Sequence, residues 1–142
     1  MAVWGIGAYF GESNGGDVSE EFIAKNIAVI GYTKTEHPEY YDLIEAIKEG
    51  DLIYIKSTRQ NSNNSPIYLK AIGIVENADI EEKSLNNGTT ASGIDVHWIQ
   101  SFSEEPIKLQ ASPSPMRSVA IFEERNKNTI KEIISHLLNC KQ

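Results

Sequence analysis

Two lysines lie in neighbouring segments of alternating sequence, each two residues after a tyrosine. Residues two apart in a β-strand point to the same side, so Tyr54 shares a face with Lys56, and Tyr68 shares a face with Lys70. Pairing of the two strands would gather two aromatic rings and two amines on one surface. Such a surface suits a phosphate and a stacked base. The alternative is a solvated face on which the lysine stems lie along apolar neighbours and the amines reach water.

The dipeptide Gly50-Asp51 precedes the first of these segments. Gly50 tolerates the positive φ found where helices end, so we expect it to end a helix over 39–49. The Asp51 carboxylate can accept hydrogen bonds from amides in the turn. A helix-to-strand turn therefore explains the pair without any functional role.

The other residues that could do chemistry form no pattern typical of a catalytic or metal site. His37, His97 and His136 are dispersed, with no HxH, HExxH or CxxC spacing. The stretch GIGAYFGESNGG lacks the Lys-Ser/Thr of a phosphate-binding loop, although an anion could sit at the helix start that follows it. Cys140, the single cysteine, is expected to be inert. We therefore predict no metal, no cofactor and no catalytic residue.

Length and composition are typical of one folded domain. The chain has 142 residues, of which 40% are hydrophobic, and no apolar run approaches the roughly 18 residues that span a bilayer. Its start lacks the basic segment of a signal peptide, and one cysteine cannot form an internal disulfide, so we expect no membrane association and a cytoplasmic location. The net charge of −7 argues against non-specific coating of DNA. It leaves room for a small, locally basic site.

Hydrophobic periodicity predicts an alternation of strands and helices. The predicted strands are short apolar or alternating runs at 3–10, 27–32, 51–57, 67–75 and 94–102. In 67–75 the alternation places Leu69 and Ala71 on one face. Polar stretches rich in turn formers predict loops at 59–66, 84–93 and 111–118. The segment SVAIFEE could be either a strand or a helix start.

Three helices are predicted from capping residues and apolar stripes. Asp17 is a candidate N-cap, with Glu20 in a capping box. The helix over 39–49 presents an apolar face of Tyr40, Leu43, Ile44 and Ile47. A C-terminal helix carries a stripe of Ile130, Ile133, Ile134, Leu137 and Leu138, and we expect it to pack on the sheet or to form a dimer seam. The element order, with strands in runs and 51–57 antiparallel to 67–75, predicts an α+β fold with a curved mixed or barrel-like sheet.

The stretch YYDLIEAIKEGDLIYIKS, followed by IYLKAIGIVENAD, resembles the core of the PUA-like superfamily, and within it the EVE domains. The shared features are a helix leading to Gly50-Asp51, a strand ending in the polar pair Lys56-Ser57, and a strand ending in IGIV. An aromatic-rich first strand and the sequence VIGY also fit. The resemblance covers about 3–100 and implies a pseudo-barrel with flanking helices. We therefore expect a single PUA-like domain over 1–142, with a core of about 3–102 and a C-terminal extension, 103–142, that has no counterpart.

EVE and related domains tend to bind nucleic acids, often holding a modified base in an aromatic cage. For this chain the resemblance implies ligand-binding rings at Trp4, Tyr9, Phe10, Tyr32 and Trp98, with Asp51, Lys56 and Ser57 as polar partners. Those domains usually carry a basic surface, whereas this chain is acidic. A small ligand such as a nucleotide would need only the pocket.

Three functions follow as alternatives. The first is a non-catalytic module that recognises a nucleotide or a modified nucleobase in bacterial or phage nucleic-acid biology. The second is an interaction or inhibitor protein that binds a protein partner through its acidic surface. The third is a small nucleoside-directed hydrolase, since some PUA-like relatives of the ASCH type are thought to use a lysine, a role open to Lys56 or Lys70.

Overall fold

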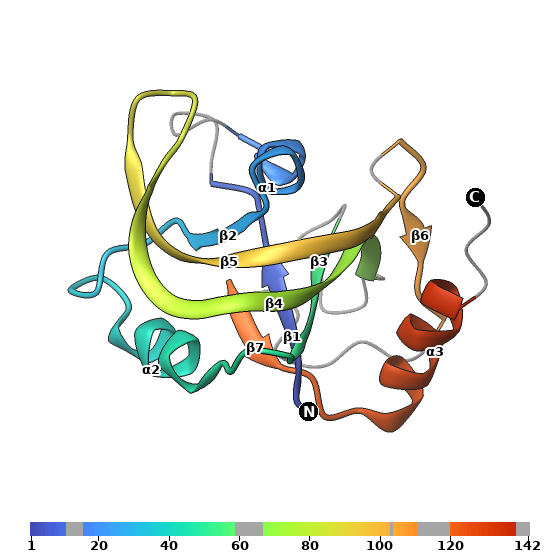
Figure 1. Ribbon diagram of the computed structural model, residues 1–142. Helices are drawn as coiled ribbons and strands as arrows, with labels where there is room; N and C mark the ends of the chain where they lie inside the picture. The colour runs from blue at the N-terminus through green and yellow to red at the C-terminus, as the bar shows by residue number, and fades with distance from the viewer. Residues whose placement is uncertain (11–15, 59–66, 103, 111–119, 139–142) are drawn as a thin grey trace.

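The computed structural model describes residues 1–10, 16–58, 67–102, 104–110 and 120–138, and the structural statements below concern those residues. The strands are β1 (Val3–Gly7), β2 (Ile27–Ile30), β3 (Leu52–Thr58), β4 (Ile67–Ser84), β5 (Thr90–Ser101), β6 (Ile107–Lys108) and β7 (Ile121–Glu123). The helices are α1 (Ser19–Lys25), α2 (Pro38–Ala46) and α3 (Lys127–Leu138). Figure 1 shows the sheet curled into a half-barrel with the helices around it.

The sheet is mixed, with the strand order β2-β5-β4-β3-β1-β7 and β6 also paired to β4. β1 and β3 run parallel, and the other neighbouring strands run antiparallel. The predicted α+β class, with a curved mixed sheet, flanking helices and a C-terminal helix, is confirmed. The predicted antiparallel pairing of 51–57 with 67–75 is also confirmed.

The long β4–β5 hairpin gives the sheet its curl. Its register shifts between Ile72 and Gly73, and again on both sides of Asn77. Extra residues of this kind bend a strand and increase its twist. The hairpin consequently curves, and the N-terminal part of β5 pairs with β2, from Asp95 opposite Ile27 to Ser92 opposite Ile30.

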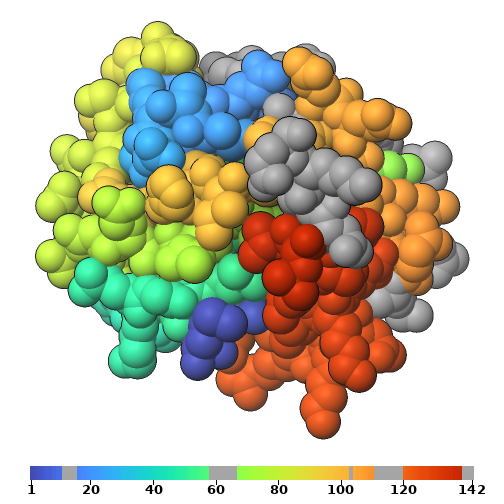
Figure 2. All heavy atoms as spheres, turned by 45° about the vertical axis from the view of Figure 1, so that its right-hand side comes forward, coloured from blue at the N-terminus to red at the C-terminus, as the bar shows by residue number. Residues whose placement is uncertain are grey.

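The two faces of the sheet bury two separate hydrophobic clusters. The first lies inside the curl and includes Trp4, Ile53 and Trp98, with α1 and α2 packed against it. The second lies under α3 and includes Tyr54 and Phe122. In Figure 2 α3 appears in red over this second face. Of the two predicted roles of α3, packing on the sheet is the one observed, since Ile133 is fully buried there and Ile130, Ile134 and Leu137 pack against the cluster. Leu138 of the predicted stripe is exposed.

Several predicted boundaries are wrong by a few residues. Strands 3–10 and 27–32 end at Gly7 and Ile30. Part of the predicted loop 84–93 belongs to the ends of β4 and β5, because these strands stay paired as far as Ser84 and Thr90. The ambiguous segment SVAIFEE contains β7. The predicted loops 59–66 and 111–118, and Cys140, lie outside the described residues.

The two predicted helix ends also differ from expectation. α1 has Val18 at the N-cap, while the Asp17 carboxylate accepts hydrogen bonds from the amide and the hydroxyl of Ser19. α2 ends at Ala46, because Ile47 is already extended. Gly50 therefore does not end the helix. Its φ of 87° lies in the next turn, which the Asp51 amide closes by donating to the Lys48 carbonyl at 3.1 Å.

Candidate functional site

The two tryptophans predicted to line a pocket are core residues. Trp4 and Trp98 are 3% and 8% exposed, and both belong to the cluster inside the curl. The indole N–H of Trp4 donates to Oδ2 of Asp51 at 2.9 Å. The indole N–H of Trp98 donates to the Ile27 carbonyl at 3.1 Å. Buried indoles need such partners, and here the protein itself supplies them.

Asp51 connects the first strand to the turn before β3. Besides the Trp4 indole, its carboxylate accepts the amides of Ala2 at 3.1 Å and Lys48 at 3.0 Å. Burial opposes ionisation of this carboxyl, but the donated hydrogen bonds outweigh it, so the pKa of Asp51 is lowered. Three hydrogen-bond donors thus contact this carboxylate. Its role in the fold is to stabilise the turn that was predicted from Gly50-Asp51.

The predicted wall of two tyrosines and two lysines does not form, and a β-bulge is the reason. Ile55 pairs with Ala71, but Lys56 pairs with Leu69, so the register skips Lys70. Leu69 consequently lies in the cluster under α3 and Ala71 in the cluster inside the curl. The prediction that these two residues share a face is therefore wrong. Lys70 instead forms an ion pair with Asp17.

Tyr54 and Lys56, which were predicted to share a surface with Lys70, lie under α3 instead. Lys56 is 6% exposed, with its Nζ 5.8 Å from the centre of the Phe122 ring. The fully buried Tyr54 donates its hydroxyl to Oε1 of Glu124 at 2.7 Å. Burial and the Glu124 carboxylate both raise the pKa of Tyr54. Ser57 follows Lys56 on β3 and pairs with Tyr68.

Phe10 and Tyr32 are brought together at a cleft of about 430 Å³. The cleft lies between the loop after β2 and the end of the β4–β5 hairpin, and Tyr41 of α2 also lines it. Its lining is aromatic and rich in hydroxyls: Phe10, Ile30, Gly31, Tyr32, Thr33, Lys34, Tyr41, Glu82, Leu85, Thr89, Thr90, Ala91 and Ser92. The other predicted site residues are not part of this lining, and Tyr9 is 64% exposed outside it.

Hydrogen bonds and ring contacts hold the loop that carries Tyr32. The Thr33 amide donates to Oε1 of Glu36 at 2.8 Å, and the Glu36 amide donates to the Thr33 hydroxyl at 3.2 Å. The Tyr41 hydroxyl donates to the Tyr32 carbonyl at 3.0 Å. The Tyr32 ring meets the His37 ring edge-on at 4.4 Å between centres, and His37 stacks on Tyr40. The loop thus presents Tyr32, which is 43% exposed, in a supported position.

Phe10 reaches the cleft because a glycine faces it. A Cβ atom on Gly31 would lie 2.8 Å from the Phe10 ring, closer than real contacts allow. The other side of the Phe10 ring packs edge-on against Phe22 of α1 at 6.1 Å between centres. The ring is therefore half-buried, with one part in the core contact and another part in the lining.

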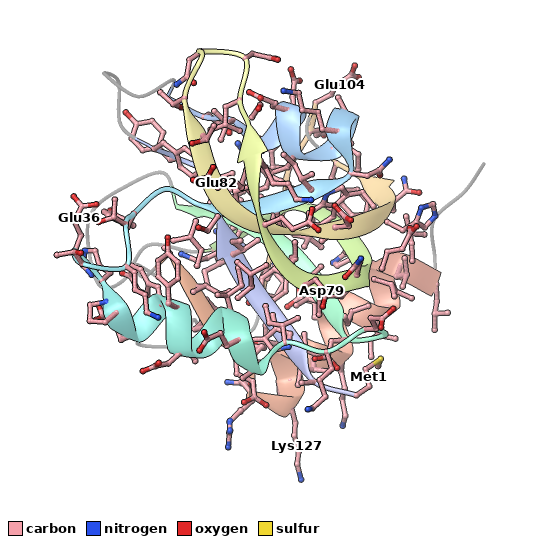
Figure 3. All side chains as sticks on the ribbon, turned by 60° about the vertical axis from the view of Figure 1, so that its left-hand side comes forward. Met1, Glu36, Asp79, Glu82, Glu104 and Lys127 are labelled. Carbon is pink, nitrogen blue, oxygen red and sulfur yellow. The ribbon has the colours of Figure 1, made fainter. Side chains whose placement is uncertain are left out.

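The charges of the cleft are few and come from opposite walls. Lys34 is the one basic side chain in its described lining, and Glu82 of β4 is the one acidic side chain. Glu36, which bonds Thr33, adds a second carboxylate at the loop wall, and Figure 3 shows Glu36 and Glu82 on the same side of the molecule. The Thr33 amide lowers the pKa of Glu36, so this group is ionised at neutral pH.

A second hollow follows β5 and has a different character. Its volume is about 700 Å³, and it is lined by Ser101, Phe102, Glu104, Glu105, Pro106 and Ile107. Among the described residues of that lining, the charged groups are both carboxylates and Phe102 is the one aromatic ring. The described part of this hollow therefore offers neither a cation for a phosphate nor a second ring for stacking.

Sequence reasoning missed most of the cleft lining. Lys34, Thr33 and Tyr41 follow the predicted strand 27–32 but carry no motif. The hydroxyls of the hairpin wall lie in the stretch NNGTTAS, which reads as an ordinary turn. Their common signal is a content of hydroxyl-bearing residues, a signal too frequent in proteins to single out a site.

Comparison with known proteins adds no family to these observations: neither protein-family models nor curated protein sequences match the chain. Within the described residues, no helix is long and apolar enough to cross a membrane. The same part of the chain contains no group of three or more histidine, cysteine or acidic side chains placed to hold a metal ion.

Proposed function

We propose that this protein is a binding module of the PUA-like, EVE type that recognises a nucleotide or a modified nucleobase in the cleft between the β2–α2 loop and the β4–β5 hairpin. The observation that carries the proposal is the pair of rings, Phe10 and Tyr32, in a cleft of about 430 Å³. Cavities of roughly 300–1,000 Å³ are typical of small-molecule sites. A flat base stacked on such a ring gains about 1–3 kcal/mol.

The polar lining suits the edge of a base. Thr33, Thr89 and Thr90 place hydroxyl groups in the lining, and a hydroxyl can either donate or accept a hydrogen bond. Glu82 adds an acceptor for an amino group and Lys34 a donor for an acceptor or a phosphate. A ring bound between such groups would be recognised by both its face and its edge.

The hydrolase alternative finds less support at this site. Lys56 and Lys70, the lysines considered for that role, are engaged elsewhere, one beside Phe122 and one with Asp17. Neither belongs to the lining of the cleft. A binding role needs only the rings and polar groups that the cleft contains.

The test is a calorimetric titration of the protein with nucleosides and 5′-mononucleotides, both unmodified and methylated on the base. Tyr32→Ala should weaken binding roughly tenfold or more, because a stacking ring is lost. Tyr9→Ala is the matched control, since Tyr9 is an exposed tyrosine outside the lining. Thermal melts must show that both variants remain folded.

Two results would overturn the proposal. One is the absence of binding by the wild type at millimolar ligand. The other is a loss in Tyr9→Ala as large as in Tyr32→Ala, because the cleft would then not be the binding site. In the first case a protein partner for the acidic surface becomes the better hypothesis.

A further inference from the structure

Resting on the proposed function, we infer that the cleft takes a single nucleotide, with its phosphate at Lys34, and excludes a continuous nucleic-acid strand. The charged groups around the cleft are one cation, Lys34, in the lining that contains the aromatic rings, and carboxylates on both walls.

Lys34 is available to a ligand in a way that the nearby lysines are not. Lys25 is paired with Glu21 at 2.9 Å, Lys83 with Asp95 at 2.7 Å, and Lys70 with Asp17. Among the described residues, no carboxylate lies within ion-pairing distance of Lys34, and its side chain is exposed. Its ammonium can therefore meet one phosphate without first leaving a carboxylate.

The walls of the cleft oppose any further phosphates. Glu82 lines the hairpin wall, and Glu36 is held at the loop wall by the Thr33 amide. Further exposed carboxylates lie on α2 and β4: Glu39, Asp42, Glu45, Asp79 and Glu81, of which Glu39 contacts His37 and Glu81 contacts Lys83. A nucleic-acid strand carries a phosphate at every nucleotide and gains affinity by exchanging counterions for cationic side chains. A strand leaving this cleft over either wall would meet carboxylates instead.

The range of these charges is sufficient for discrimination. The Debye length is about 8–10 Å at physiological ionic strength, so carboxylates on the walls act on the phosphates next to the bound nucleotide. A mononucleotide has no neighbouring phosphates and keeps its one phosphate near Lys34. The arrangement thus selects for a free nucleotide by repelling a polymer of the same chemistry.

The experiment is a calorimetric comparison of one nucleoside, its 5′-monophosphate, inorganic phosphate and a single-stranded 12-mer of the same base. The expected order of affinity is monophosphate, then nucleoside, then oligonucleotide counted per site, with inorganic phosphate weakest. Lys34→Gln should weaken the monophosphate roughly three- to fivefold, the effect of one exposed ion pair, and weaken the nucleoside by less. Lys131→Gln, an exposed lysine of α3, has the same charge change and should alter neither.

The double variant Glu36→Gln/Glu82→Gln tests the repulsion. It should strengthen binding of the 12-mer, more so at low salt, and change nucleoside binding by less than the 12-mer gain. The inference is wrong if the nucleoside binds but Lys34→Gln affects nucleoside and monophosphate alike, if the wild type prefers the 12-mer, or if inorganic phosphate binds as tightly as the monophosphate. If no compound binds, the proposed function fails together with it.

Discussion

Two pairs of aromatic residues in this protein were both predicted to bind a ligand, but they have different roles in the structure. Trp4 and Trp98 lie inside the curl of the sheet, with both indole N–H groups bonded to the protein itself. Phe10 packs against the outside of the same hydrophobic cluster, and Phe10 and Tyr32 both line the cleft. The comparison teaches that an aromatic residue in a strand gains its role from what lies on its other side. A tightly paired sheet buries the ring, whereas a loop at the strand end leaves it accessible.

The largest expected effect is on the buried side of this comparison. Trp98→Ala should lower the free energy of unfolding by about 3–5 kcal/mol, because it leaves a cavity and orphans the Ile27 carbonyl. Denaturant unfolding measures the change. Ile99→Ala, at an exposed neighbouring position, is the control and should cost less than about 1 kcal/mol. Equal losses in both variants would show that Trp98 is not the core residue described here.

The next effect concerns the buried carboxylate that holds Trp4. Asp51→Asn should cost about 1–3 kcal/mol at neutral pH, since an amide cannot accept three hydrogen bonds from donors that suit a carboxylate. The pKa of Asp51 is lowered in the folded protein, so its ionised form stabilises the fold above the unfolded pKa of about 4. That stabilisation is lost as pH falls through the folded pKa.

Unfolding of wild type and Asp51→Asn from pH 7 to pH 3 tests this linkage. The difference between the two proteins should stay constant down to about pH 5 and shrink below about pH 4. Asp42→Asn, which removes an exposed carboxylate of α2, should show no such convergence. A difference that grows at low pH would contradict the assigned direction of the shift.

A smaller effect is expected where the core meets the cleft. Gly31→Ala would press a methyl group against the Phe10 ring, so the ring must move. We expect a loss of about 1 kcal/mol in unfolding free energy, at the low end for added core atoms because Gly31 is exposed. Binding of a nucleotide should weaken more clearly. Unchanged binding in a folded Gly31→Ala variant would remove Phe10 from the site.

The smallest effect on stability is expected at Tyr32, which lines the cleft. Tyr32→Ala should cost at most about 1 kcal/mol, the value of its edge-on contact with His37. Thermal and denaturant unfolding measure this cost against that of Trp98→Ala. A loss as large as the one at Trp98 would mean that Tyr32 is a structural residue and that the two pairs do not differ.

Part of the fold was predictable because it depends on local pattern. The apolar stripe of α3 allowed its packing on the sheet, and Ile44 of α2 is buried as the helix pattern required. The alternation in 51–57 correctly separated Ile53 and Ile55 from Tyr54. Such patterns are local because the period of a helix or strand is a property of the backbone.

Part of the site was not predictable, and the region around Lys56 shows why. Alternation placed Lys56 beside Lys70, but the bulge skips Lys70 and sends it to Asp17. Alternation also does not say whether the second face of a strand meets solvent or a helix, and here α3 covers it. Both decisions come from segments distant in sequence.

The amino-acid sequence by itself determined the α+β class, the central antiparallel pair, the C-terminal helix and the acidic charge of this protein. Tertiary structure alone decided which aromatic residues are buried in the core and which line the cleft. Trp4 finds Asp51 47 residues away, and Trp98 finds Ile27 71 residues away. The cleft likewise joins a loop after β2 to a hairpin some fifty residues later in the chain. The local periodicity of the sequence predicts none of these contacts, because they depend on how the bulged sheet curls.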